Sequence, residues 1–293
     1  MTSYGIKTGK LSDDFKLFHL KDKSNIQFDY HYHDFNKLII FISGNVVYNI
    51  EGKAYELQPW DVLLVPSGQV HKPLIEPITE YERIVFWINN SFLEQHSSEN
   101  GKLLSCFSIA QNDMMHVIRP QLTTLDSLKT LLLLLEKEIK GREFASTIMA
   151  NSLFVQMIIS INRLFIKKDA QIKKIEVQYD ESILKILQYI NSNIEKELTI
   201  EFLSAKFFIN KFYLMHKFKA CTGYTLHNYI NNKRLIKANE LIKNGISMSE
   251  AAQQCGFNDY SSFVRAFKRQ FGLSPKNYLK QINSLYKQIV IEG

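Results

Sequence analysis

The chain has 293 residues, 45% of them apolar, and a formal charge of +7. That length predicts two or three globular domains, each with enough apolar residues for a core. Its three cysteines lie far apart, so neither a disulfide framework nor a zinc site is predicted. The first 15 residues lack the apolar core of a signal peptide, and polar residues interrupt the most apolar run, Ile148 to Ile166. A soluble, cytoplasmic protein with no membrane partner is therefore expected.

The short β-rich runs come first in the chain. From about Ile26 to Ile88, runs such as KLIIFIS, VVYNIEG, VLLVPSG and YERIVFWIN alternate with turn signals. This pattern predicts an antiparallel barrel or sandwich. Because several runs are apolar at every position, the sequence does not say which residues face the interior.

The period of the apolar residues becomes helical between Leu122 and Ile166, with a break near Gly141, which predicts two antiparallel helices. The leucine run Leu131–Leu135 exceeds what one buried face needs. Packing against the barrel and against a second subunit would use both faces, and an intramolecular core explains the run nearly as well. The polar segment 167–180 is predicted to be a linker.

Two similar helix-turn-helix layouts follow. Thr199 and Asn210 stand where they can cap a short helix and then a longer one, and Ser247 and Asp259 repeat this order. Gly256 lies in the second turn, where a left-handed residue is needed. The helix between the two layouts, with about 19 residues, would measure roughly 28 Å, close to the ~34 Å of one duplex turn. One chain can therefore reach two successive major grooves on one face of a duplex.

The positive charge lies in this C-terminal part. Residues 1–179 hold 20 Lys and Arg against 20 Asp and Glu, whereas residues 180–293 hold 16 against 9. Such an excess favours a polyanionic partner, although the surface lysines of an ordinary domain would give the same count.

The outward face of the second helix in each layout carries the candidate DNA contacts. Residues near the start of such a helix can reach base edges, and cations further along can bind phosphates. Any one of these residues alone reads as an ordinary solvated side chain, but the paired layout favours DNA contact. The candidate DNA-binding residues are Lys211, Phe212, Met215, His216, Lys219, Tyr260, Ser261, Arg265, Lys268 and Arg269.

From Leu198 to Tyr278 the chain resembles the double helix-turn-helix domain of the AraC/XylS family of transcriptional regulators. The resemblance rests on YLMHKFKACTG, KRLIKANELI and MSEAAQQCGFNDYSSFVRAFKRQFGLSPKNY. It implies sequence-specific binding to double-stranded promoter DNA, RNA polymerase as a partner, a homodimer through the helical pair and, most often, activation. Lys217 departs from the family pattern, in which an apolar residue is commoner, and is expected to turn outward toward a phosphate.

The N-terminal strands resemble the cupin-like sensor barrel that members of this family carry. HYHDFNKLIIFISGN and LQPWDVLLVPSGQVHKP carry this resemblance, which implies a small-molecule effector. His31 and His33 share one face of a strand, and His71 follows at the spacing of the second motif. Metal-binding cupins have a glutamate where this sequence has Lys37, and a cation there would repel a divalent metal. No metal and no cofactor are therefore expected.

Lys37 and Arg83 together would favour an anionic ligand such as a carboxylate or a phosphosugar. The histidines would equally suit a structural role, hydrogen-bonded at the mouth of the barrel. The candidate effector-binding residues are His31, His33, Lys37, His71, Arg83 and Trp87.

These patterns predict an α+β protein. A cupin-like sensor barrel with an N-terminal arm is expected over residues 1–120, a dimerising helical pair over 121–166, a linker over 167–180 and an all-α double helix-turn-helix domain over 181–293. The expected function is a ligand-responsive transcriptional activator and not an enzyme. Two alternatives stay open: a metal-dependent cupin enzyme fused to a DNA-binding module, and a regulator that needs no ligand.

Overall fold

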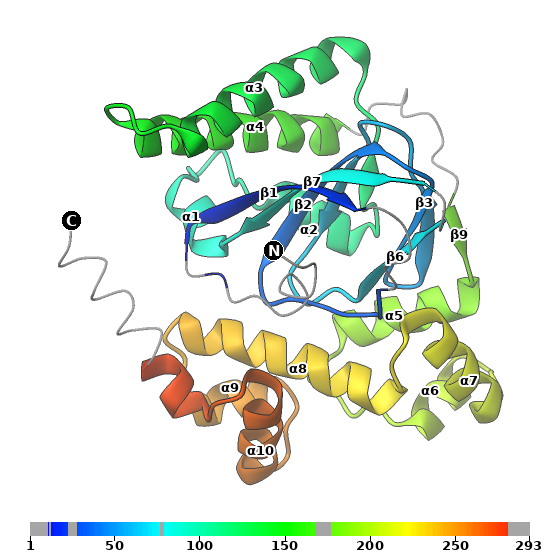
Figure 1. The fold of residues 1–293 in the computed structure, drawn as a ribbon. Helices are drawn as coiled ribbons and strands as arrows, with labels where there is room; N and C mark the ends of the chain where they lie inside the picture. Colours follow the sequence, from blue (N-terminus) through cyan, green and yellow to red (C-terminus); the bar gives the residue numbers. More distant parts are fainter. Residues whose placement is uncertain (1–10, 12, 23–27, 77–78, 168–176, 281–293) are drawn as a thin grey trace. The chain divides into compact units, whose positions relative to one another are not determined.

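The computed structural model describes residues 11, 13–22, 28–76, 79–167 and 177–280 (Figure 1). The chain divides into two compact units, Met1–Gln178 and Tyr179–Gly293. The described part of the first unit combines strands with helices, and that of the second is helical after Tyr179. This confirms the predicted α+β class.

The first unit contains two sheets. The larger has the strand order β1-β7-β2-β5-β8 and the smaller the order β6-β3-β4-β9. Strands next to one another in the larger sheet, such as β2 and β7, run antiparallel, as predicted. The strands are β1 (Phe15–Asp22), β2 (Asn36–Ser43), β3 (Val46–Ile50), β4 (Lys53–Glu56), β5 (Val62–Val65), β6 (His71–Ile75), β7 (Tyr81–Ile88), β8 (Val117–Ile118) and β9 (Val177–Tyr179).

The central strands of the larger sheet are buried on both faces, which explains why they do not alternate. On β2, Leu38 and Ile40 join a core shared with the helices, while Ile39 and Phe41 join a core shared with the smaller sheet. Because side chains alternate along a strand, Lys37 lies on the same face as Ile39. The interior between the two sheets is therefore lined by the odd-numbered positions of β2.

Four helices complete the described part of the first unit, and the predicted helical pair is among them. They are α1 (Asn90–Gln95), α2 (Ser105–Asn112), α3 (Leu122–Lys140) and α4 (Ser146–Lys167). Phe154, Ile158 and Phe165 of α4 are fully buried in the core beneath the larger sheet. Among the described residues, α4 alone is long and apolar enough to span a membrane by composition, yet 44% of its most apolar window is buried inside this unit. Core helices of globular proteins pass the same test.

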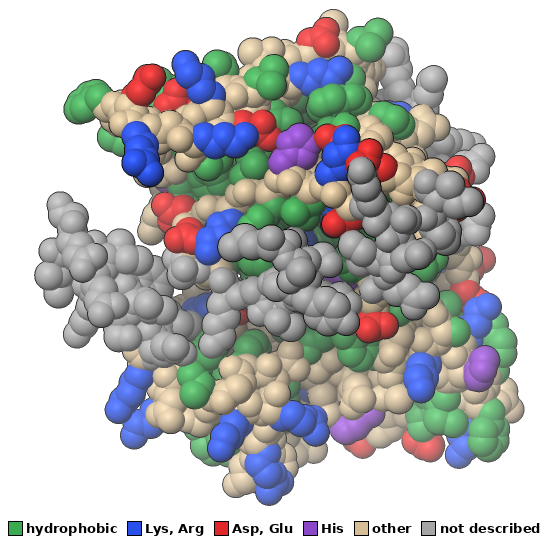
Figure 2. Space-filling view, in the orientation of Figure 1, with side chains coloured by type: hydrophobic (Ala, Val, Ile, Leu, Met, Phe, Trp, Pro, Cys, Tyr) green, Lys and Arg blue, Asp and Glu red, His purple; other side chains and the backbone are tan. Residues whose placement is uncertain are grey.

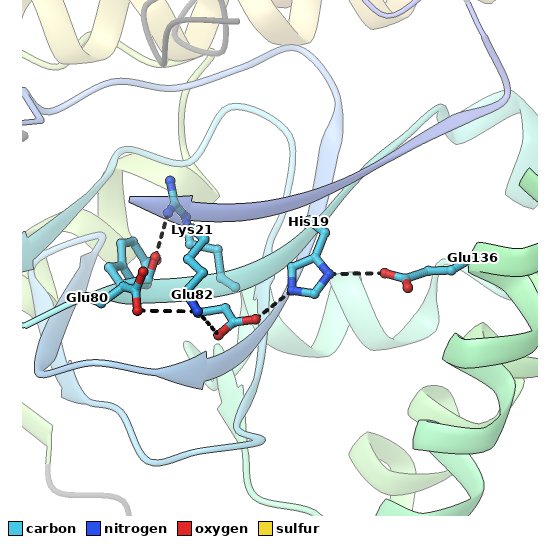
Figure 3. Close-up of polar contacts among 7 residues, drawn as sticks. His19, Lys21, Glu80, Glu82 and Glu136 are labelled. Atoms are coloured by element: carbon cyan, nitrogen blue, oxygen red, sulfur yellow. Dashed lines mark hydrogen bonds and ion pairs between the residues drawn. The ribbon is translucent and has the colours of Figure 1, made fainter. Parts of the chain in front are cut away.

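Polar contacts also hold α3 against the larger sheet (Figure 3). His19 on β1 contacts Glu82 on β7 through Nε2 at 2.8 Å and Glu136 on α3 through Nδ1 at 3.4 Å. Lys21 lies 3.3 Å from Glu80 and 3.7 Å from Glu82. The contact between His19 and Glu136 thus joins α3 to the sheet in addition to apolar packing.

Two strands differ from the sequence-based expectation. Residues 15–22, expected in an N-terminal arm, form β1, which pairs with β7 from Phe15 opposite Ile88 to Asp22 opposite Tyr81. β9 lies inside the predicted linker, and its three residues are too few for a periodic signal. The rest of that linker, residues 168–176, lies outside the described residues.

The second unit contains the two predicted helix-turn-helix layouts. Its helices are α5 (Glu181–Ser192), α6 (Ile200–Lys206), α7 (Lys211–Thr222), α8 (Leu226–Lys243), α9 (Met248–Gln254) and α10 (Tyr260–Phe271). All four predicted caps are confirmed, because the side chains of Thr199, Asn210, Ser247 and Asp259 each accept a backbone N–H of the helix that follows. The connecting helix α8 has 18 residues, close to the predicted length, and ends at Lys243 with Asn244 as its C-cap.

Candidate nucleic-acid interface and barrel site

The turn of the second helix-turn-helix is built around Gly256. This residue has a φ of +79°, in the left-handed region that glycine favours, as predicted. A Cβ added to it would lie 2.7 Å from the carbonyl oxygen of Glu195. Arg234 on α8 donates to the carbonyl oxygens of Ile194 and Lys196, at 2.9 and 2.6 Å. Both the turn and α8 are therefore held against the segment that precedes α6.

The buried stripe of α10 sets the rotation of this helix. Phe263 and Phe267 are fully buried in a core shared with α8 and α9. The carboxylate of Asp259 caps the helix by accepting the N–H of Ser262 at 2.7 Å. Hydrogen bonds from the hydroxyl and the N–H of Ser262 lower the pKa of Asp259. The opposite face, which includes Arg265, is left to solvent.

Helix α7 is anchored in the same way but presents a different outward face. Leu214 and Phe218 are fully buried. On the other side, Phe212 is 69% exposed and Met215 is 44% exposed. The outward face of α7 therefore exposes two large apolar side chains beside its cations.

Lys217 does not take the position expected of it. Its ammonium lies 3.4 Å from Oδ2 of Asp180, the cap of α5, and Tyr213 donates to the same oxygen at 3.3 Å. The hydrogen bond and charge of Asp180 raise the pKa of Lys217. Its charge is thus directed at α5 rather than at a phosphate. The family pattern could not indicate this, because the partner lies on another helix.

The outward face of α7 forms one wall of a groove of about 790 Å³. The other walls come from the segment before α6, from the start of α8 and from the turn after α9. Residues of α7 and of the turn that line it include Phe212, Met215, His216, Lys219 and Asn258. The outward face of α7 therefore forms part of a concave surface.

All ten candidate DNA-binding residues are exposed. Lys211 also lies 3.7 Å from Glu201 of α6, in an exposed ion pair. Figure 2 shows basic side chains gathered over α10, and apolar side chains mixed with basic and histidine ones over α6 and α7. Arg234 and Asn258, which line the groove, were not predicted, since neither lies on the outward face of a recognition helix.

In the barrel, three histidines converge. His31, His33 and His71 each present a ring nitrogen, and these nitrogens lie within 4.8 Å of one another. Nδ1 of His31 and Nδ1 of His71 lie 2.8 and 2.9 Å from the backbone carbonyls of Asp29 and Gln69. A carbonyl only accepts hydrogen bonds, so Nδ1 of each ring carries a proton. Nε2 of His33 is buried and has no hydrogen-bond partner among the residues that the structure describes.

Lys37 belongs to the same cluster. Its Nζ lies 3.4 Å from Nε2 of His71, and the side chain is buried. Burial, and then the charge of Arg83, lower the pKa of Lys37 to about 7. Burial and neighbouring positive groups hold the pKa values of His33 and His71 well below the usual range, so both rings are neutral at pH 7. Within the described residues, Lys37 forms no salt bridge.

Arg83 and Trp87, the other two candidate effector-binding residues, differ in whether their polar groups already have partners. Arg83 is buried and pairs with Asp22 at 2.6 Å, and its guanidinium lies over the ring of Tyr81 at 4.0 Å. Its charge is therefore already balanced. Trp87 lies opposite Lys37 in the β2–β7 register, and in the described part of the chain its buried Nε1 has no hydrogen-bond partner. Within the described residues, a cation without a carboxylate partner and two polar atoms without a hydrogen-bond partner thus belong to this cluster.

The spacing of the three imidazoles is compatible with a metal ion, because carbonyls that fix Nδ1 are typical of metal-binding histidines. Lys37 opposes this use. Its ammonium already faces Nε2 of His71, one of the lone pairs that a metal would need. The expectation that no metal is bound stays a prediction.

Two family models match the chain. The model described as an AraC-like ligand binding domain matches residues 18–149, and the one described as a helix-turn-helix domain matches residues 203–281. The probable transcriptional regulator LumQ of Photobacterium leiognathi is 37% identical over 91 residues, which cover 31% of this chain and 37% of LumQ. The HTH-type transcriptional activator RhaS of Mannheimia succiniciproducens is 28% identical over 251 residues, which cover 85% of this chain and 88% of RhaS.

A crystal structure of an apo ToxT variant from Vibrio cholerae strain SCE256 covers 92% of this chain and 98% of ToxT, at 16% identity. The TM-score of this comparison, 0.37, is too low to support an inference about function.

Proposed function

The chain belongs to the AraC/XylS family of transcriptional regulators, and on this premise we propose that it activates transcription from promoter DNA under the control of a small anionic effector. Relatives named as transcriptional activators support activation rather than repression. RNA polymerase is the partner that activation requires.

The single observation that supports DNA binding most strongly is the pair of helix-turn-helix units joined by α8. A helix of 18 residues measures about 27 Å, which suits the ~34 Å repeat of successive major grooves. The exposed outward faces of α7 and α10 supply the candidate contacts. The test is to select duplexes from a random library with the full-length protein. A chain that enriched no sequence would contradict the proposal.

The barrel cluster supports an anionic effector. Lys37 is a buried cation with no carboxylate partner among the described residues, and His33 and Trp87 add unpartnered polar atoms beside it. A carboxylate or phosphate would satisfy these groups together. Because Arg83 is paired with Asp22, the anion is expected to depend on Lys37.

We expect small carboxylates and sugar phosphates that bind the barrel to raise its unfolding temperature, followed through Trp60 and Trp87, both of which lie in the first unit. Lys37→Met should abolish this shift. Lys53→Met is the matched control, because Lys53 is half-buried in the same barrel and donates to the carbonyl of Met114 at 2.9 Å. Stabilisation by neutral sugars that was equal in wild type and Lys37→Met would contradict an anionic effector.

Binding of the anion should also depend on pH. The anion requires the charged form of Lys37, whose pKa is about 7 in the free protein. Affinity is therefore highest below pH 7 and should fall by up to about tenfold per unit as the pH rises above 7. The neutral rings of His33 and His71 do not change charge in this range.

The alternative function, a metal-dependent cupin enzyme, would need a metal in the barrel. Elemental analysis of the purified protein should find less than one equivalent of tightly bound transition metal. One equivalent, lost in His71→Ala, would instead support a metal-dependent cupin enzyme.

We further propose a homodimer through α3 and α4. Leu133 and Leu134 of α3 and Ile148 of α4 expose large apolar side chains, which a second copy would cover. Light scattering at micromolar concentration tests this, and a monomer with and without DNA would contradict it.

A further inference from the structure

The outward face of α7 carries apolar side chains where a DNA-reading helix would be expected to carry polar ones. Phe212 and Met215 lie three residues apart, on one side of the helix, and are 69% and 44% exposed. Neither belongs to the buried stripe, which consists of Leu214 and Phe218. Large apolar side chains exposed together on a helix indicate a surface that is covered in a complex.

Charge around this face favours nucleic acid as what covers it. Lys211 precedes Phe212, Lys219 follows Met215 by one turn, and His216 lies between them, all exposed. Lys219, His216, Phe212 and Met215 line the same groove of about 790 Å³. Cations that flank an apolar strip fit a duplex, whose phosphates lie on either side of the base edges in the major groove.

Among the four bases, one offers an apolar group in the major groove. Thymine carries a C5 methyl group there, and apolar side chains contact it, whereas the other bases present only donors and acceptors at their major-groove edges. We propose that α7 reads thymine methyl groups through Phe212 and Met215, while α10 reads hydrogen-bonding edges through Arg265. This inference rests on the proposed DNA-binding function. It names the base that the first helix-turn-helix selects.

The two helices would then read different chemistry. On α10 the positions that correspond to Phe212 and Met215 are Ser261 and Val264. The exposed Arg265 and Lys268 correspond to His216 and Lys219. Arg265 also donates to Ser262 at 2.9 Å, so its guanidinium is held near the start of the helix. One half of the binding site is therefore expected to depend on thymine methyls and the other on a base with paired acceptors, such as guanine.

Deoxyuridine provides the test, because it differs from thymidine only by the missing methyl group. The full-length protein is titrated against its selected duplex, with each dT replaced singly by dU. The base pairs at which Arg265→Ala loses its preference identify the half of the site that α10 reads. The other half is the one that α7 reads. In that half, one or two replacements should weaken binding by about fourfold each, the value of one buried methyl group at about 0.8 kcal/mol.

The variants locate this discrimination on α7. Phe212→Ala and Met215→Ala should bind the dT and dU duplexes equally at the position that each side chain contacts. Tyr213→Ala is the matched control, since Tyr213 is an exposed aromatic residue on the same helix but turns toward Asp180. It should keep the fourfold difference. Circular dichroism of each variant confirms that the helices are intact.

Each outcome bears on the inference separately from the proposed function. Sequence-specific binding that ignored every dT-to-dU change would overturn methyl reading and leave the DNA-binding function standing. Discrimination confined to the half assigned to α10, or kept in both Phe212→Ala and Met215→Ala, would overturn the role of α7. Failure of the full-length protein to select any sequence would overturn the proposed function itself.

Discussion

Raising the salt concentration from 50 to 200 mM is expected to lower the affinity of the full-length protein for its selected duplex on the order of 10³-fold. Each cation that neutralises a phosphate releases counterions, and the linear dependence of log affinity on log salt counts these contacts. The second unit offers exposed cations on both recognition helices, among them Lys219, Lys268 and Arg269. An affinity that did not change with salt would contradict DNA binding through this unit.

The variants Lys268→Ala and Arg265→Ala distinguish phosphate contacts from base contacts. The two cations lie on the same face of α10, and Arg265 is nearer the start of the helix. Lys268→Ala should weaken binding to all sequences and lower the salt slope by roughly one. Arg265→Ala should weaken the free energy of binding to the selected duplex by about 1 to 3 kcal/mol and relax the base preference at one or two base pairs. If Arg265→Ala lost the same factor on every single-base variant, Arg265 would contact a phosphate instead of a base.

The helical half of the molecule could be predicted in detail because its signals are local. A cap such as Asp259 and a buried pair such as Phe263 and Phe267 lie within one helix, so spacing alone identifies them. The same spacing identified which faces of α7 and α10 are exposed. It could not identify the partner of Lys217, because Asp180 comes from another helix.

The barrel could be predicted only in outline. The strands β2 and β7 are apolar at nearly every position because helices cover one face and the smaller sheet covers the other. Period-two alternation, the signal that would separate interior from exterior, is therefore absent. The convergence of His31, His33 and His71 followed from the motif spacing, but the pairing of Arg83 with Asp22 depends on the register of β1, a strand that was not predicted.

Gly256→Ala is expected to lower the free energy of unfolding of the second unit by roughly 2 to 5 kcal/mol. About 1 to 2 kcal/mol comes from placing a Cβ in the left-handed region. A further 1 to 3 kcal/mol or so comes from the overpacking that follows, because the Cβ would lie 2.7 Å from the backbone oxygen of Glu195, which cannot rotate away as a side chain would.

Gly272→Ala separates these two contributions. Gly272 has nearly the same φ, +78°, but no atom of the described residues that can clash lies within 4 Å of its added Cβ. Only the left-handed strain of about 1 to 2 kcal/mol should therefore appear in this variant. Hydrogen exchange of peptides from α8 to α10 measures the stability of the second unit, and tryptophan fluorescence, which reports only the first unit, should not change. Equal losses in the two variants would mean that the turn has room beside Glu195, and that the close contact between Gly256 and the segment before α6 does not hold the second helix-turn-helix in place.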